Sequence, residues 1–104
     1  MPREVEPEFS ECIRDLCQAF LTCNQDALLL QRFLRDLWTF TEARQFANRW
    51  QVACRLLEGK TQTETARELR LSSKTVHAVS EFVNGPYATG GYAEVAKRLR
   101  QGRH

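Results

Sequence analysis

The chain has 104 residues, the size of one small domain. Hydrophobic residues make up 42% and charged residues 27%, as in average globular proteins, which excludes a wholly disordered chain and a collagen-like repeat. The longest apolar run, residues 27–30, is far shorter than the ~20 residues of a membrane helix, and the acidic N-terminus lacks a secretory signal. We therefore expect a single domain over residues 1–104 that is cytoplasmic and makes no membrane contact.

The net charge of +2 is unevenly distributed. Residues 1–58 carry seven Lys/Arg and nine Asp/Glu, a net charge of −2, whereas residues 59–104 carry eight and four, a net charge of +4. A basic C-terminal half suits a polyanionic partner such as DNA. An ordinary solvated surface would have the same charge, so both interpretations stay open at this point.

Metal-binding patterns are absent from the sequence. The four cysteines are Cys12, Cys17, Cys23 and Cys54. They form no Cys-x-x-Cys pair, and only two histidines are present to complete a site, so we predict no metal and no cofactor. Cys17 and Cys54 fall on apolar helical faces, where we expect free cysteines to act as small hydrophobes.

Three apolar stripes predict three helices over residues 8–58, preceded by a flexible N-terminus at residues 1–7. The first stripe runs from Glu8 to about residue 22. Asn24 is the predicted N-cap of the second helix. A capping-box pattern at residues 39–42 opens the third helix, and Gly59 ends it.

These three stripes carry more large apolar side chains than single, closely linked helices bury by themselves. The large residues include Phe9, Phe20, Phe33, Leu37, Trp38, Phe46 and Trp50. We therefore interpret residues 8–58 as dimerisation helices of an intertwined homodimer. A compact monomeric core is the alternative.

Residues 61–84 predict a helix-turn-helix. A capping-box pattern at residues 61–64 opens a short helix, and Ser72 is the predicted N-cap of the next one. Three residues at intervals of five support this prediction. Ala66 is a small residue that lets the two helices cross closely, Leu71 fills the turn between them, and Val76 packs the second helix against the first. In that second helix Val76, Val79 and either Phe82 or Val83 face inward. A last helix follows at residues 92–101.

A helix-turn-helix places the N-terminal, outward-facing residues of its second helix in the DNA major groove. Hydroxyl and lysine side chains there bond phosphates and base edges, and the first turn of the preceding helix adds phosphate contacts. The candidate DNA-binding residues are Gln62, Thr63, Ser73, Lys74, Thr75, His77 and Ala78. The alternatives are a structural helical hairpin with a polar outer face and, for His77, an ordinary surface position.

The sequence resembles the Trp repressor superfamily. The similarity lies in RWQVACRLLEGKT at residues 49–61, followed by Glu64, Ala66 and Glu68-Leu69. The motif YATGGY at residues 87–92, together with segments 16–21 and 33–37, is similar to the Trp-repressor-related proteins called the YerC/YecD group. The resemblance covers residues 12–100.

The resemblance implies an all-α fold: a six-helix subunit interlocked with a second copy, with the helix-turn-helix units projecting. It also implies where an amino-acid corepressor would bind. Thr39 and Arg49 match two of the family's ligand-binding residues, but the third falls at Ala78, which has no charge. Val79 and Phe82 replace small residues that leave room for an indole, so we predict that tryptophan is not the corepressor.

Two functions from different classes remain. The first is a homodimeric, sequence-specific DNA-binding transcriptional regulator, a repressor by resemblance. The alternative is a helical protein-interaction module that has the fold without useful DNA binding, which Glu81 on the second helix favours. An enzyme is not predicted, because no carboxylate pair, nucleophile–base set or phosphate-binding loop is present.

Overall fold

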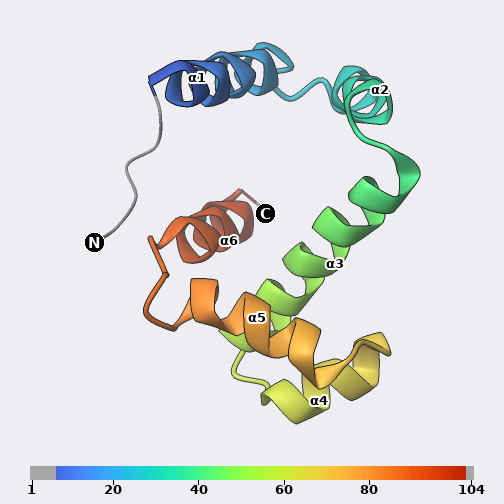
Figure 1. Ribbon diagram of the computed structural model, residues 1–104, viewed down its shortest axis with the longest axis vertical. Coiled ribbons are helices and arrows are strands. Elements are labelled where there is room, and N and C mark those ends of the chain that lie inside the picture. Colours follow the sequence, from blue (N-terminus) through green and yellow to red (C-terminus); the bar gives the residue numbers. More distant parts are fainter. Residues whose placement is uncertain (1–6, 103–104) are drawn as a thin grey trace. The chain divides into compact units, whose positions relative to one another are not determined.

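The computed structural model describes residues 7–102, which contain six α-helices and no strand (Figure 1). The helices are α1 (Pro7–Thr22), α2 (Ala27–Leu37), α3 (Phe40–Leu57), α4 (Gln62–Leu69), α5 (Ser73–Val83) and α6 (Gly91–Gln101). The predicted all-α, six-helix subunit is confirmed. The predicted flexible segment lies outside the described residues, except for Pro7, where α1 begins.

The chain divides into two compact units, Met1–Phe40 and Thr41–His104. The first unit contains α1 and α2. The second contains α3 from its second residue onward, together with α4, α5 and α6. The single domain expected over residues 1–104 stays a prediction.

In the first unit, the turn between α1 and α2 corrects one prediction. Asn24 does not cap α2. Asn24 and Gln25 have left-handed backbone conformations, with φ of 27° and 67°, whereas an N-cap residue is extended. Asp26 has the extended conformation, and its Oδ1 accepts a hydrogen bond of 3.0 Å from the Leu29 N–H. The cap is therefore two residues later than predicted.

Aromatic contacts hold α1 against α2. The Phe20 ring lies 5.7 Å from that of Phe33, edge to face, and 6.4 Å from that of Trp38. Cys23 is buried, but Cys17, expected on an apolar face, is exposed. Large apolar side chains that remain exposed in this unit are Phe9, Ile13, Leu21, Leu28, Leu37 and Phe40. The helices of the first unit thus leave much of their apolar stripes in solvent.

In the second unit, Gly59 ends α3 as predicted. Its φ of +95° suits a glycine, and it allows two hydrogen bonds that close the helix. The Gly59 N–H donates to the Leu56 carbonyl and the Lys60 N–H to the Arg55 carbonyl, both at 3.1 Å. This is the Schellman arrangement. It reverses the chain into α4 within four residues, 58–61.

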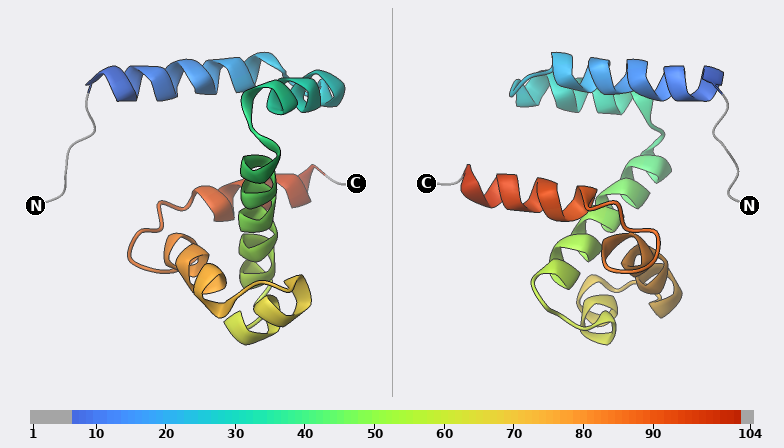
Figure 2. Two further views of the ribbon diagram at one scale, coloured as in Figure 1. Left: turned by 45° about the vertical axis from the view of Figure 1, so that its right-hand side comes forward. Right: turned by 90° about the vertical axis from the view of Figure 1, so that its left-hand side faces the viewer.

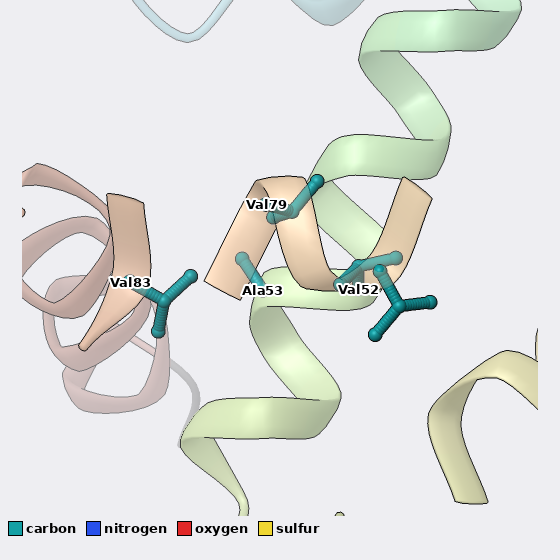
Figure 3. Packing of buried hydrophobic residues seen from close by; sticks show 5 residues of the cluster. Val52, Ala53, Val79 and Val83 are labelled. Atoms are coloured by element: carbon teal, nitrogen blue, oxygen red, sulfur yellow. The ribbon is translucent and has the colours of Figure 1, made fainter. Parts of the chain in front are cut away.

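The core of the second unit lies where α5 crosses α3 (Figure 3). Its buried members are Val52, Ala53, Val76, Val79 and Val83. The predicted inward positions of Val76 and Val79 are confirmed. Of the last pair, Val83 is 9% exposed and Phe82 51%, so Val83 completes the inner face. The views of Figure 2 show α4 and α5 side by side at one end of α3.

The connection from α5 to α6 turns tightly at Gly85. A Cβ atom there would lie 2.7 Å from the Cα of Glu81, so only glycine fits. The Tyr87 N–H donates to the Glu81 carbonyl at 3.1 Å and closes the turn. At the start of α6 the Tyr92 ring stacks on Trp50 of α3, with ring centroids 6.3 Å apart. This contact ties α6 to α3.

Candidate nucleic-acid interface

The N-terminus of α4 is fixed by the predicted capping box. The Glu64 N–H donates to the Thr61 Oγ1 at 3.0 Å, and the Thr61 N–H donates to a Glu64 carboxylate oxygen at 3.1 Å. The hydrogen bond from the Thr61 backbone lowers the pKa of Glu64 below its usual value, with a smaller contribution from the Thr61 side chain. Gln62 and Thr63, in the first turn, are exposed.

The turn between α4 and α5 is short and rigid. Arg70 ends α4 in the left-handed conformation, with φ of 57°, and the Leu71 N–H donates to the Ala66 carbonyl at 3.0 Å. Ser72 then caps α5, because its Oγ accepts a hydrogen bond of 3.1 Å from the Thr75 N–H. The predicted place of Leu71 in the turn and the predicted cap at Ser72 are both confirmed.

Ion pairs tie α4 to the end of α3. A Glu68 carboxylate oxygen lies 3.1 Å from Arg55 Nε, and the other lies 2.8 Å from Lys60 Nζ. The hydrogen bonds from Lys60 and then Arg55 lower the pKa of Glu68. These groups fix the orientation of α4 on α3.

The two faces of α5 differ sharply. The inner face consists of Val76, Val79, Ser80 and Val83, which are buried. All the predicted DNA-binding residues are exposed: Gln62, Thr63, Ser73, Lys74, Thr75, His77 and Ala78. Within the described part of the chain, no carboxylate lies within ion-pair distance of Lys74. DNA contact by these residues stays a prediction.

A hydrogen-bond network joins α4 to the middle of α5. Gln62 Nε2 donates to Ser80 Oγ at 3.2 Å, and Gln62 Oε1 lies 3.4 Å from His77 Nδ1. Ser80 Oγ in turn donates to the His77 carbonyl at 2.6 Å, and Glu81 Oε1 lies 3.6 Å from His77 Nε2. Sequence reasoning missed the roles of Ser80 and Glu81. The four-residue spacing of His77 and Glu81 was a readable signal, whereas Ser80 gave none.

A pocket of about 480 Å³ lies between α3, α5 and the start of α6. Arg49 lines it, together with Ala78, Val79 and Phe82, the three positions at which the sequence is predicted to depart from the family's ligand-binding pattern. Thr39, the other predicted ligand residue, belongs to the first unit. Its role therefore stays a prediction.

The described residues contain neither a metal-ion cluster nor a membrane-spanning helix. Within residues 7–102, no group of three or more His, Cys, Asp or Glu side chains is arranged to hold a metal ion. None of the described helices is both long and apolar enough to cross a membrane.

A short capped helix, a tight turn and a second helix with an exposed polar N-terminal face define a helix-turn-helix protein. The comparisons name its family. The family model described as Trp repressor protein matches residues 11–100, and the chain belongs to that family. The family consists of DNA-binding regulators, not enzymes. No curated protein and no solved structure matches the chain.

Proposed function

We propose that this protein is a sequence-specific transcriptional repressor that binds double-stranded DNA as a homodimer through α4 and α5. The observation that carries the proposal is the two-faced α5, in which a buried valine face fixes the helix while its N-terminal polar residues stay exposed. We place the protein in the cytoplasm and, within its family, nearest to the YerC/YecD group.

The proposed contacts follow from the chemistry of each side chain. Lys74 bonds a phosphate or the acceptor edge of guanine, and Thr75 and His77 contact base edges. Gln62 and Thr63 lie at the N-terminus of α4, where exposed N–H groups and the helix dipole attract a phosphate. Thr63 has no guanidinium group, so we do not assign a guanine to it.

The DNA contact is tested by replacing Lys74. Lys74→Ala is expected to weaken binding to every duplex in a random pool and to reduce the slope of log K against log salt by about one, because one counterion fewer is released. Thr75→Ala and His77→Ala are expected instead to change which sequences are selected. Binding is measured by fluorescence anisotropy over a series of salt concentrations.

Lys97→Ala, which removes an exposed lysine from α6, is the matched control and is expected to leave the slope unchanged. If the wild-type chain shows no salt-sensitive binding to the pool, the alternative function, a protein-interaction module, takes the place of the repressor. Glu81, close to His77 on α5, is the observation that favours this alternative.

A further inference from the structure

The hydrogen bonds around His77 form a closed ring, in which the donor and the acceptor of each bond can be assigned. Ser80 Oγ donates its proton to the His77 carbonyl at 2.6 Å, so its lone pairs face the Gln62 amide. Gln62 Nε2 therefore donates to Ser80, and this fixes which end of the amide faces the imidazole. Gln62 Oε1, an acceptor, lies 3.4 Å from His77 Nδ1.

This assignment determines which nitrogen of the neutral imidazole carries the proton. A hydrogen bond to Gln62 Oε1 requires a proton on Nδ1, which leaves Nε2 as an acceptor. Glu81 Oε1, 3.6 Å from Nε2, is also an acceptor and therefore cannot bond to the unprotonated Nε2. The Nε2 lone pair of the neutral ring is thus left for a donor from outside the protein, at a side chain that is 64% exposed.

We propose that Gln62 and Ser80 are positioning residues that hold neutral His77 as its Nδ1–H tautomer, so that Nε2 accepts a hydrogen bond from a base in the major groove. The major-groove donors are the exocyclic amino groups of adenine and cytosine. His77 then selects adenine or cytosine at one position of the site. This inference rests on the proposed DNA-binding function.

Ser80→Ala separates positioning from direct contact. Ser80 is 4% exposed and cannot itself reach DNA, and alanine removes only the hydroxyl that orients Gln62. Selection from a random duplex pool at pH 8 is expected to show the same relaxed position in Ser80→Ala as in His77→Ala, with two- to tenfold weaker binding to the wild-type site, about the value of one hydrogen bond. Thr89→Ala, which removes an exposed hydroxyl outside the proposed DNA-binding residues, is the control and is expected to keep the preference at that position.

Nitrogen-15 NMR of the imidazole tests the positioning without DNA. The wild type is expected to show the Nδ1–H tautomer for His77, assigned by comparison with His77→Gln, and both Ser80→Ala and Gln62→Ala are expected to shift it toward Nε2–H. An Nε2–H tautomer in the wild type, or spectra unchanged in both variants, overturns the proposal. If the wild type binds no DNA, the proposed function fails, while the spectra still decide whether Gln62 and Ser80 position the ring.

Discussion

Side chains along one edge of α5 determine what the pocket beside Arg49 accepts. Its volume of about 480 Å³ lies in the range of small-ligand sites, so space alone does not exclude an amino acid. The charges that line it are not those that the resemblance to the family implies for an amino-acid site. Ala78 offers no donor for a carboxylate, and Val79 and Phe82 occupy part of the lining. Arg49 and Lys74 remain as cations, which suits a small anion better than an indole.

We expect tryptophan not to bind at physiological concentrations. Losing one charge-assisted hydrogen bond to the carboxylate costs ~1.5–3 kcal/mol, a loss of about tenfold to 150-fold in affinity. Calorimetric titration is expected to show no saturable heat below about 100 μM L-tryptophan, whose corresponding free energy is roughly −5.5 kcal/mol. Ala78→Arg is expected to strengthen binding, and Ala93→Arg, the same change on α6, is not. Saturable heat in the wild type below that concentration contradicts the prediction.

The ion pairs of Glu68 with Arg55 and Lys60 make the free energy of unfolding depend on pH. The pKa of Glu68 is lower in the folded chain than its ordinary value of 4.5, so its contribution is fully present above the unfolded-state pKa. It is lost as the pH falls through the folded-state pKa. We therefore expect Glu68→Gln to unfold at lower urea concentration than the wild type at pH 7, and the difference to shrink as the pH falls below 4.5 and to disappear below the folded-state pKa. Glu11→Gln, which removes an exposed carboxylate of α1, is the matched control and is expected to unfold at the same urea concentration as the wild type at pH 7.

At the scale of elements, the tight turn after α5 leaves no space for a side chain at Gly85. Gly85→Ala would place a Cβ 2.7 Å from the Glu81 Cα and 2.9 Å from its carbonyl oxygen, both backbone atoms that cannot move without distorting α5. We expect a loss of ~1–3 kcal/mol in the free energy of unfolding. Gly91→Ala is the matched control, because the nearest atom, Thr89 Oγ1, is 3.6 Å away. Equal urea midpoints for the two variants would contradict the prediction.

Helix ends were predictable from sequence where they depend on local spacing. The capping box at Thr61, the cap at Ser72 and the glycine at position 59 each involve bonds within three to five residues, so the pattern alone specifies them. The predicted cap of α2 was wrong because local spacing leaves two candidates there. Asn24 and Asp26 are both good capping residues, and only the backbone conformation of the turn distinguishes them.

Contacts between helices were less predictable. The exposed face of α5 followed from helical periodicity, so the candidate interface was identified from the sequence. The contact between Gln62 and Ser80 joins residues 18 positions apart and depends on the angle at which α4 crosses α5. No sequence period encodes that angle. Likewise, the sequence did not decide whether Phe82 or Val83 is buried, because that depends on the path of the last turn of α5.

At the scale of the whole molecule, the exposed apolar stripes predict association. Phe9 in the first unit is 56% exposed, and Val95 and Leu99 on α6 are also exposed. Apolar surface of this kind marks a protein interface. We expect light scattering at micromolar concentration to give about twice the chain mass of 12.1 kDa.

Ile13→Glu is expected to shift the protein toward the monomer, because it places a carboxylate among the predicted dimerisation helices, on a side chain that is 45% exposed. Arg14→Gln changes the net charge by the same amount on the same helix and is expected to stay dimeric. A wild-type chain that is folded and monomeric at these concentrations would rule out the intertwined homodimer.

The core of the second unit draws on a short span of sequence, from Val52 to Val83, with helix ends that are fixed locally. Little chain entropy is lost in bringing such neighbours together, so we expect this unit to fold quickly. In the proposed homodimer, the meeting of two chains is then the slow, concentration-dependent step. Operator occupancy would rise more steeply than in proportion to the amount of protein made, so the rate of synthesis becomes part of the regulation.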